Sequence, residues 1–169
     1  MRRRRTAGIG LLAGLMLIGA CGEEIPEPQA ARDAMPDKPA CELIRDADLQ
    51  QIFVNQLAAD TEDGSSMRRC IWKDAASNQP FVQYELHPYI EDLQTQVDRM
   101  QQERGESVNA RFIQGIGDEA VWTDAGLFVN RNGRTLQVRP LQDDENRAPY
   151  QELARLLLTR LEEGQGPAR

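Results

Sequence analysis

The stretch LFVNRNGRTLQV, residues 127–138, decides the fold of this chain. At its centre lies Asn132-Gly133, the dipeptide favoured in a two-residue type I′ hairpin turn. The residues that this turn would place opposite each other are Leu127 and Val138, Val129 and Leu136, and Arg131 and Arg134. The apolar pairs then share one face, as a half-buried antiparallel sheet requires. We therefore expect a β-hairpin that turns one face to the core.

Three other segments have the composition of strands. RCIWK (69–73) and FVQYELH (81–87) are joined by a turn around residues 77–78, and AVW (120–122) precedes the hairpin. The residues of the second segment that lie on one face are Val82, Tyr84 and Leu86. This alternation of apolar and polar residues indicates strands with one buried face.

Helices are predicted where apolar residues recur at spacings of three and four. The first has Asp46 as its N-cap, the second begins near Pro88, and the third begins near residues 148–149 and ends at Gly164. The apolar residues of these helices are Leu49, Ile52 and Phe53, then Ile90, Leu93, Val97 and Met100, then Leu153, Leu156, Leu157 and Leu161. The acidic residues 143–145 favour the positive N-terminal end of the third helix. The chain is predicted to be α+β, an antiparallel sheet of about five strands covered by two or three helices.

Composition divides the chain into four segments. Residues 1–20 read as a signal peptide and residues 21–40 as a lipidated N-terminus with a disordered tether, because four Pro and several acids replace large apolar residues there. Residues 41–163 have the patterns of one globular domain, within which residues 59–67 are expected to form an acidic loop. Residues 164–169 (GQGPAR) read as a flexible tail.

The N-terminus has the parts of an export signal. Four Arg at positions 2–5 precede an apolar run of residues 7–20, which is shorter than the roughly 20 residues that a membrane-spanning helix needs. Both the twin-arginine and the ordinary secretory route stay open. The run ends in LIGAC (17–21), which resembles the lipobox of bacterial lipoproteins. The resemblance implies cleavage before Cys21 and lipid attachment to its thiol, and Gly22 after it favours the outer membrane over the inner.

The charge of the chain limits its partners. The formal net charge is −7, which excludes a broadly basic nucleic-acid binder. Removal of residues 1–20, which contain four Arg and no acid, would leave 16 basic and 27 acidic residues and a net charge of −11. An acidic domain adds no attraction to anionic lipid, so acyl chains have to anchor it.

Two cysteines remain if Cys21 carries lipid. Cys41 and Cys70 would both be exported, and a pair of cysteines in an oxidising compartment is most simply a disulfide. A catalytic cysteine is the alternative, but the lone His87 would be its base and nothing nearby in sequence orients that imidazole. A metal site is not expected either, because one His and three Cys provide few ligands.

Short motifs in the domain resemble a loose group of uncharacterised bacterial lipoprotein domains. The motifs are Cys-x-Leu at residues 41–43, Cys-x-Trp at residues 70–72 and Gly-x-Gly-Asp-x-Ala at residues 115–120. The resemblance spans about 100 residues of this chain. It implies an α+β lipoprotein domain with a disulfide, and it brings no catalytic residue or activity.

Other candidate sites have simpler explanations. Gly115 and Gly117 lack the third glycine of a dinucleotide fingerprint, so we expect a tight loop in which Asp118 bonds to backbone amides. A group of acids before a glycine could suggest a calcium site, but its spacing does not fit a calcium-binding loop. The residues are Asp60, Glu62, Asp63 and Gly64. The hydroxyls at residues 65–66 lack the elbow motif of serine hydrolases. The residues that could line a ligand groove, but that strand positions favour as core, are Trp72, Tyr84 and Trp122.

These patterns predict a lipid-anchored protein of the bacterial cell envelope, most simply at the outer membrane and facing the periplasm. We expect it to be non-catalytic, to need no cofactor, and to present its acidic domain to an envelope protein or a small ligand. One alternative is an immunity or inhibitor lipoprotein that captures a basic enzyme in the periplasm, since acidity suits a basic partner. The other is an envelope hydrolase that uses carboxylates as acid and base.

Overall fold

The computed structural model describes residues 39–63, 67–88, 91–142 and 145–163. The helical elements are the 3-10 turn η1 (Ala40–Glu42), α2 (Asp46–Ile52), α3 (Leu93–Arg104) and α4 (Ala148–Glu163). The strands are β1 (Leu57–Asp63), β2 (Arg68–Asp74), β3 (Pro80–Pro88), β4 (Arg111–Ile113), β5 (Glu119–Thr123), β6 (Gly126–Arg131) and β7 (Arg134–Pro140). The predicted signal peptide, Cys21, most of the tether and the tail lie outside the described residues.

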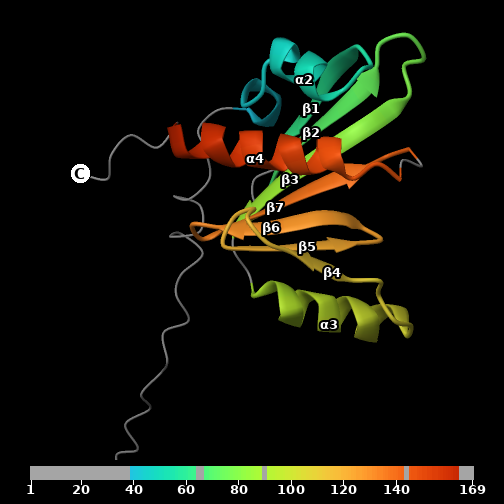
Figure 1. The fold of residues 1–169 in the computed structure, drawn as a ribbon. Helices are drawn as coiled ribbons and strands as arrows, with labels where there is room; N and C mark the ends of the chain where they lie inside the picture. The colour runs from blue at the N-terminus through green and yellow to red at the C-terminus, as the bar shows by residue number, and fades with distance from the viewer. Residues whose placement is uncertain (1–38, 64–66, 89–90, 143–144, 164–169) are drawn as a thin grey trace, which may run out of the picture.

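All seven strands form one antiparallel sheet in the order β1-β2-β3-β7-β6-β5-β4 (Figure 1). The hairpin of β6 and β7 has the predicted register, with Val129 opposite Leu136 and Arg131 opposite Arg134. Asn132 and Gly133 both have positive φ, as the type I′ turn requires. The α+β prediction is confirmed, with three α-helices among the described residues.

The prediction of about five strands was too low because both edge strands were missed. Residues 57–63 form β1 where an acidic loop was expected, and its sequence LAADTED carries little apolar alternation. Its pairing with β2 supplies the stability, and there Lys73 Nζ lies 2.6 Å from Asp60 Oδ2. The other missed strand, β4, has only three residues, too few for a periodic pattern.

Two predicted helix starts shift. Helix α3 begins at Leu93 rather than near Pro88, because β3 continues to Pro88, which pairs with Arg134. The N-cap of α3 is Asp92, whose carboxylate accepts a hydrogen bond of 2.9 Å from the Thr95 amide. Helix α2 includes Asp46 as its first residue, with Arg45 as its N-cap. Ile90, residues 143–144 and Gly164 lie outside the described residues.

The two faces of the sheet carry different side chains, and we name them for their contents. The core face packs against η1, α2 and α4 (Figure 1). Its largest fully buried side chains include Trp72, Tyr84, Tyr150, Leu49, Leu86, Leu127, Leu136, Leu153 and Leu157. Ring pairs join these layers, since Phe53 lies 5.5 Å from both Phe81 and Tyr150 between ring centroids.

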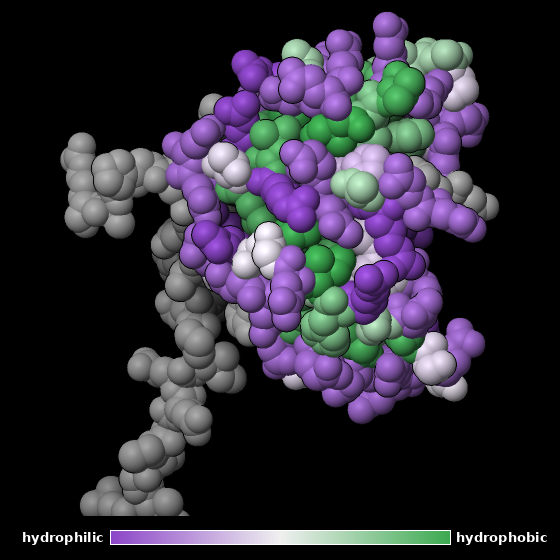
Figure 2. All heavy atoms as spheres, viewed as in Figure 1, coloured by the Kyte–Doolittle hydropathy of each residue, from purple (hydrophilic) through white to green (hydrophobic). Residues whose placement is uncertain are grey.

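The opposite face, which we call the cleft face, is covered by α3 over β5 and β6. A small second cluster of Leu93, Val97, Val121 and Phe128 holds that helix in place. Over β2, β3 and β7 the same face presents mostly polar side chains instead, with Ile71 of β2 as an apolar exception. Figure 2 has the same view as Figure 1, with α4 in front of the sheet, and shows hydrophobic residues gathered in a band between hydrophilic ones on that side of the molecule.

Candidate functional site

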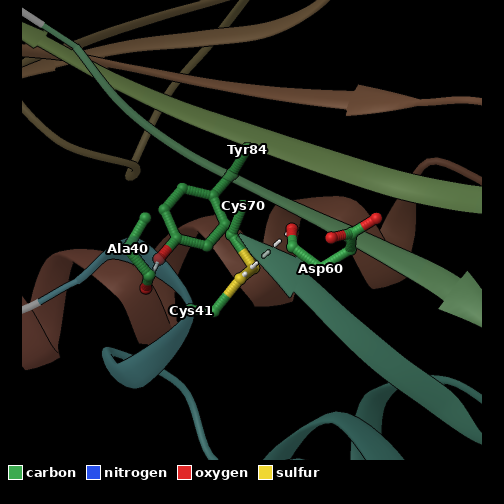
Figure 3. The surroundings of a disulfide bond; sticks show 5 residues. All are labelled: Ala40, Cys41, Asp60, Cys70 and Tyr84. Atoms are coloured by element: carbon green, nitrogen blue, oxygen red, sulfur yellow. Dashed lines mark hydrogen bonds between the residues drawn. A yellow bond between two sulfur atoms is a disulfide. The ribbon is translucent and has the colours of Figure 1, made fainter. Parts of the chain in front are cut away.

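The structure joins the two cysteines predicted to pair. Cys41 in η1 and Cys70 in β2 form a disulfide with a Cα–Cα distance of 5.1 Å (Figure 3). The Tyr84 hydroxyl donates a hydrogen bond to the Ala40 carbonyl beside it. Cys70 is fully buried on the core face, so the bridge ties the start of the domain to β2, the second strand from one edge of the sheet. Neither sulfur is a free thiol, and this rules out both as a catalytic nucleophile or a metal ligand in this state.

The three aromatic residues offered as a possible groove belong to the core. Trp72 and Tyr84 are fully buried and lie 5.4 Å apart between ring centroids. Trp122 is 7% exposed and is covered by the Arg147 guanidinium, 5.1 Å from the ring centroid. These rings are packed in the core, where they stabilise the fold.

The Gly-x-Gly-Asp motif forms the expected tight loop. Gly115 and Gly117 have positive φ, which other residues rarely adopt. The Asp118 carboxylate accepts a hydrogen bond of 3.1 Å from the backbone amide of Asn132 and lies 3.2 Å from Arg131 Nη1. The motif therefore fastens the hairpin turn to the loop that precedes β5.

The acidic segment near β1 holds no ion site that the structure describes. Asp60 pairs with Lys73, and the side chains of Glu62 and Asp63 lie outside the described part, as do residues 64–66. Among the described residues, no group of three or more His, Cys, Asp or Glu side chains is arranged to hold a metal ion.

Polar side chains on the cleft face form two neighbouring rows that cross the strands. In the first row, Arg69 of β2 lies opposite Glu85 of β3, which lies opposite Gln137 of β7, which lies opposite Phe128 of β6. The members of the second row, again opposite one another in turn, are His87, Thr135, Asn130 and Glu119. Directly opposite side chains on one face of a sheet contact each other. The site therefore takes residues from strands far apart in sequence.

Glu85 is the centre of the first row. Its Oε1 accepts hydrogen bonds of 2.7 Å from Arg69 Nε and 2.6 Å from Gln83 Nε2. Its Oε2 lies 3.0 Å from His87 Nε2. The hydrogen bond from His87, with the charge of Arg69, holds the pKa of the Glu85 carboxyl below its usual range against the opposing effect of burial. Glu85 is therefore a carboxylate that fixes the His87 ring.

The second row connects the sheet to the start of α3. The Thr135 hydroxyl donates a hydrogen bond of 2.7 Å to Asn130 Oδ1, and Asn130 Nδ2 donates one of 3.2 Å to the Glu91 carbonyl. The Glu119 carboxylate accepts a hydrogen bond of 3.2 Å from the backbone amide of Leu93. These bonds satisfy buried polar groups and place the first turn of α3 beside the rows.

Between α3 and the two rows lies a cleft of about 230 Å³. Its lining residues are Glu85, His87, Glu91, Gln96, Phe128, Thr135 and Gln137. A concave space with a few converging polar groups and one aromatic side chain has the general make-up of a ligand site. This cleft is the best candidate functional site in the part of the chain that the structure describes.

In the sequence, His87 stands out only as a partner for cysteine, and nothing nearby is expected to orient its ring. The structure corrects this, since Glu85 orients the ring from two positions away on the same strand. One signal in the sequence pointed toward the cleft. Phe128 stands on the face of the hairpin opposite Leu127 and Val129, and a large apolar residue there requires a covering element on the second face.

No protein-family model, curated protein or solved structure matches this chain. In the described part of the chain, no helix is both long and apolar enough to span a bilayer.

Proposed function

We propose that this protein is a lipoprotein of the bacterial cell envelope, anchored through Cys21, whose α+β domain binds a ligand or partner without catalysing a reaction. The anchor rests on the arginine cluster, the apolar run and the LIGAC sequence (17–21). The Gly22 that follows Cys21 favours the outer membrane, with the domain facing the periplasm. The resemblance to bacterial lipoprotein domains supports the same assignment.

The observation that carries the binding role is the cleft beside α3, whose polar groups are held in place by their neighbours. His87 has an orienting carboxylate, but the hydroxyl opposite it, that of Thr135, donates its hydrogen bond to Asn130. A nucleophile activated by a base needs that hydroxyl bonded to the imidazole instead. The arrangement favours recognition over covalent catalysis.

Anchoring is tested with the substitution Cys21→Ser. We expect loss of acyl labelling and release of the protein from membranes, because no thiol remains at the lipidated position. The matched control is the double variant Cys41→Ala and Cys70→Ala, which keeps Cys21 and should stay labelled. Continued membrane retention of Cys21→Ser would contradict the proposal.

Partner binding is tested by crosslinking the full chain in intact envelopes and extracting it with detergent. We expect discrete crosslinked species that disappear when the cleft is altered. Recovery of a free monomer alone under several crosslinkers would contradict a protein partner and leave a small ligand as the occupant.

A second candidate, an envelope hydrolase, is favoured by the oriented His87 alone, because a carboxylate–imidazole pair can serve as a general base. It would show as turnover of a cell-wall or glycan substrate by the purified full chain. That turnover should be lost in His87→Gln, which keeps a polar side chain of similar length. Absence of turnover on such substrates would favour the non-catalytic proposal.

A further inference from the structure

We propose that the cleft beside α3 takes a small organic cation, an alkylammonium or alkylguanidinium group. This rests on the proposed binding function and names the chemical class of its ligand. Three independent features of the cleft carry it: the charge of its lining, the hydrogen-bonding groups left over in it, and its aromatic side chain.

Among the described residues, the lining includes two carboxylates and no Lys or Arg. Two carboxylates, Glu85 and Glu91, line the cleft, whereas their arginine partners do not. Arg69 binds Glu85 along the sheet, and Arg99 binds Glu91 Oε1 through Nη2 at 2.7 Å from the helix surface. Each arginine approaches its carboxylate from outside the cleft. A cation inside it meets the carboxylates first, in a space partly shielded from water.

Most side-chain hydrogen-bond donors of the lining already have acceptors. The Thr135 hydroxyl donates to Asn130, and Gln137 Nε2 donates to the Ala125 carbonyl at 2.9 Å. In the neutral imidazole of His87, the contact with the Glu85 carboxylate places the N–H on Nε2 and leaves Nδ1 as an acceptor. What remains for a ligand is mostly acceptors.

The remaining acceptors are the His87 Nδ1 atom, the Gln137 Oε1 atom and the second oxygen of Glu91, with one amide from Gln96. A group with several N–H bonds and no acceptor of its own complements this set. Ammonium offers three donors and guanidinium five. An anion or a carbonyl-rich ligand would face like charge and unmatched acceptors.

Phe128 supplies the third feature. It is 6% exposed, lies under the cleft and belongs to the cluster with Leu93, Val97 and Val121 that holds α3 in place. An alkyl chain attached to the cation can rest against its ring, and the ring itself attracts positive charge. Because the cleft is smaller than the 300–1,000 Å³ usual for drug-sized ligands, a short chain fits better than a large one.

The test is isothermal titration calorimetry on the full lipidated chain in detergent. The probes are n-butylammonium and n-butylguanidinium, compared with n-butanol as the neutral analogue and butyrate as the anionic one. We expect the cations to bind with one-to-one stoichiometry and at least about tenfold more tightly than either analogue, a difference that a charged hydrogen bond provides. Binding should weaken as salt is raised.

A pair of glutamate variants, one in α3 and one just before it, locates the site. Glu91 and Glu103 both contact Arg99, but only Glu91 lines the cleft. Glu91→Gln should weaken cation binding at least about tenfold, whereas Glu103→Gln should change it less than about twofold. Gln96→Ala, at a partly exposed cleft position that perturbs folding little, should weaken it severalfold.

Equal affinity for butanol or butyrate, equal loss in both glutamate variants, or no binding of either cation would overturn the proposal. These outcomes are separable from failure of the proposed function. A chain that stays in the membrane and crosslinks to a partner but binds no cation refutes the ligand class alone. A chain that binds cations but carries no lipid at Cys21 refutes the anchor alone.

Discussion

The two faces of the sheet use the same strands for different purposes. On β3, Val82, Tyr84 and Leu86 are buried on the core face, while Gln83, Glu85 and His87 stand half-buried on the cleft face. The core face is sealed by two helices, a disulfide and a chain of aromatic contacts. The cleft face is sealed by α3 over only part of its width. A domain that needed stability alone would have apolar residues on both covered faces.

The side chains of the two faces are held in place for different physical reasons. Core-face side chains are explained by burial, which contributes roughly 25 cal/mol per Å² of apolar surface. The cleft-face rows are not explained by burial. Half-buried polar groups contribute little net stability once the cost of ordering them is subtracted. Residues that stability does not explain, gathered at a cleft, are the residues that we assign to binding.

The largest expected effect comes from breaking the core face at its covalent bond. The double variant Cys41→Ala and Cys70→Ala should lower the free energy of unfolding by about 3.6 kcal/mol, the chain-entropy value for a loop of 29 residues. Urea unfolding of the full chain measures it. As control, Lys73→Ala changes the other face of the same strand at an exposed ion pair and should cost under about 1 kcal/mol. A loss below that of the control would refute the structural role of the bridge.

The second prediction compares a glycine packed beneath the sheet with one at the end of α3. A Cβ at Gly117 would lie 2.4 Å from Val129 Cγ1 and 2.7 Å from the Asn130 carbonyl oxygen, so Gly117→Ala should cost about 2–3 kcal/mol. Gly105 has a similar positive φ but nothing within 4 Å of its Cβ, so Gly105→Ala should cost about 1 kcal/mol. Thermal unfolding of both variants isolates the packing contribution. Equal losses would mean that strain alone matters at both positions.

The smallest effect is the pH dependence of the cleft-face network. The folded pKa of Glu85 is lowered by its hydrogen bond with His87, so its contribution to stability is full above the unfolded pKa, roughly 4.3, and disappears as pH falls through the folded pKa. Glu85→Gln should therefore cost about 1 kcal/mol at pH 5.5, and the cost should shrink as the pH is lowered step by step below about 4.3. Urea unfolding at each pH measures the difference. A cost that is constant with pH would show that the charge of Glu85 contributes nothing.

Prediction from sequence worked best where a contact is local or where a pattern repeats. The turn at Asn132-Gly133 was predictable because only certain residues accept its backbone angles, and the register of β6 and β7 followed from it. Helix α4 followed from apolar residues at helical spacing, and it begins at the predicted residue. The disulfide was predicted from the hypothesis that the chain is exported and that Cys21 carries lipid, which leaves one pair of cysteines. Each depends on information within a few residues or on a simple count.

The edge strands and the cleft depend on contacts between residues far apart in sequence. β1 and β4 lack a pattern of their own and are strands because β2 and β5 offer them hydrogen bonds. The rows of the cleft bring together Arg69, Glu85 and Gln137 from three strands, and no local spacing relates those positions. Local chemistry sets turns, helices and the buried side of each strand. The strand order sets which polar side chains meet, because it is fixed by the packing of the whole sheet.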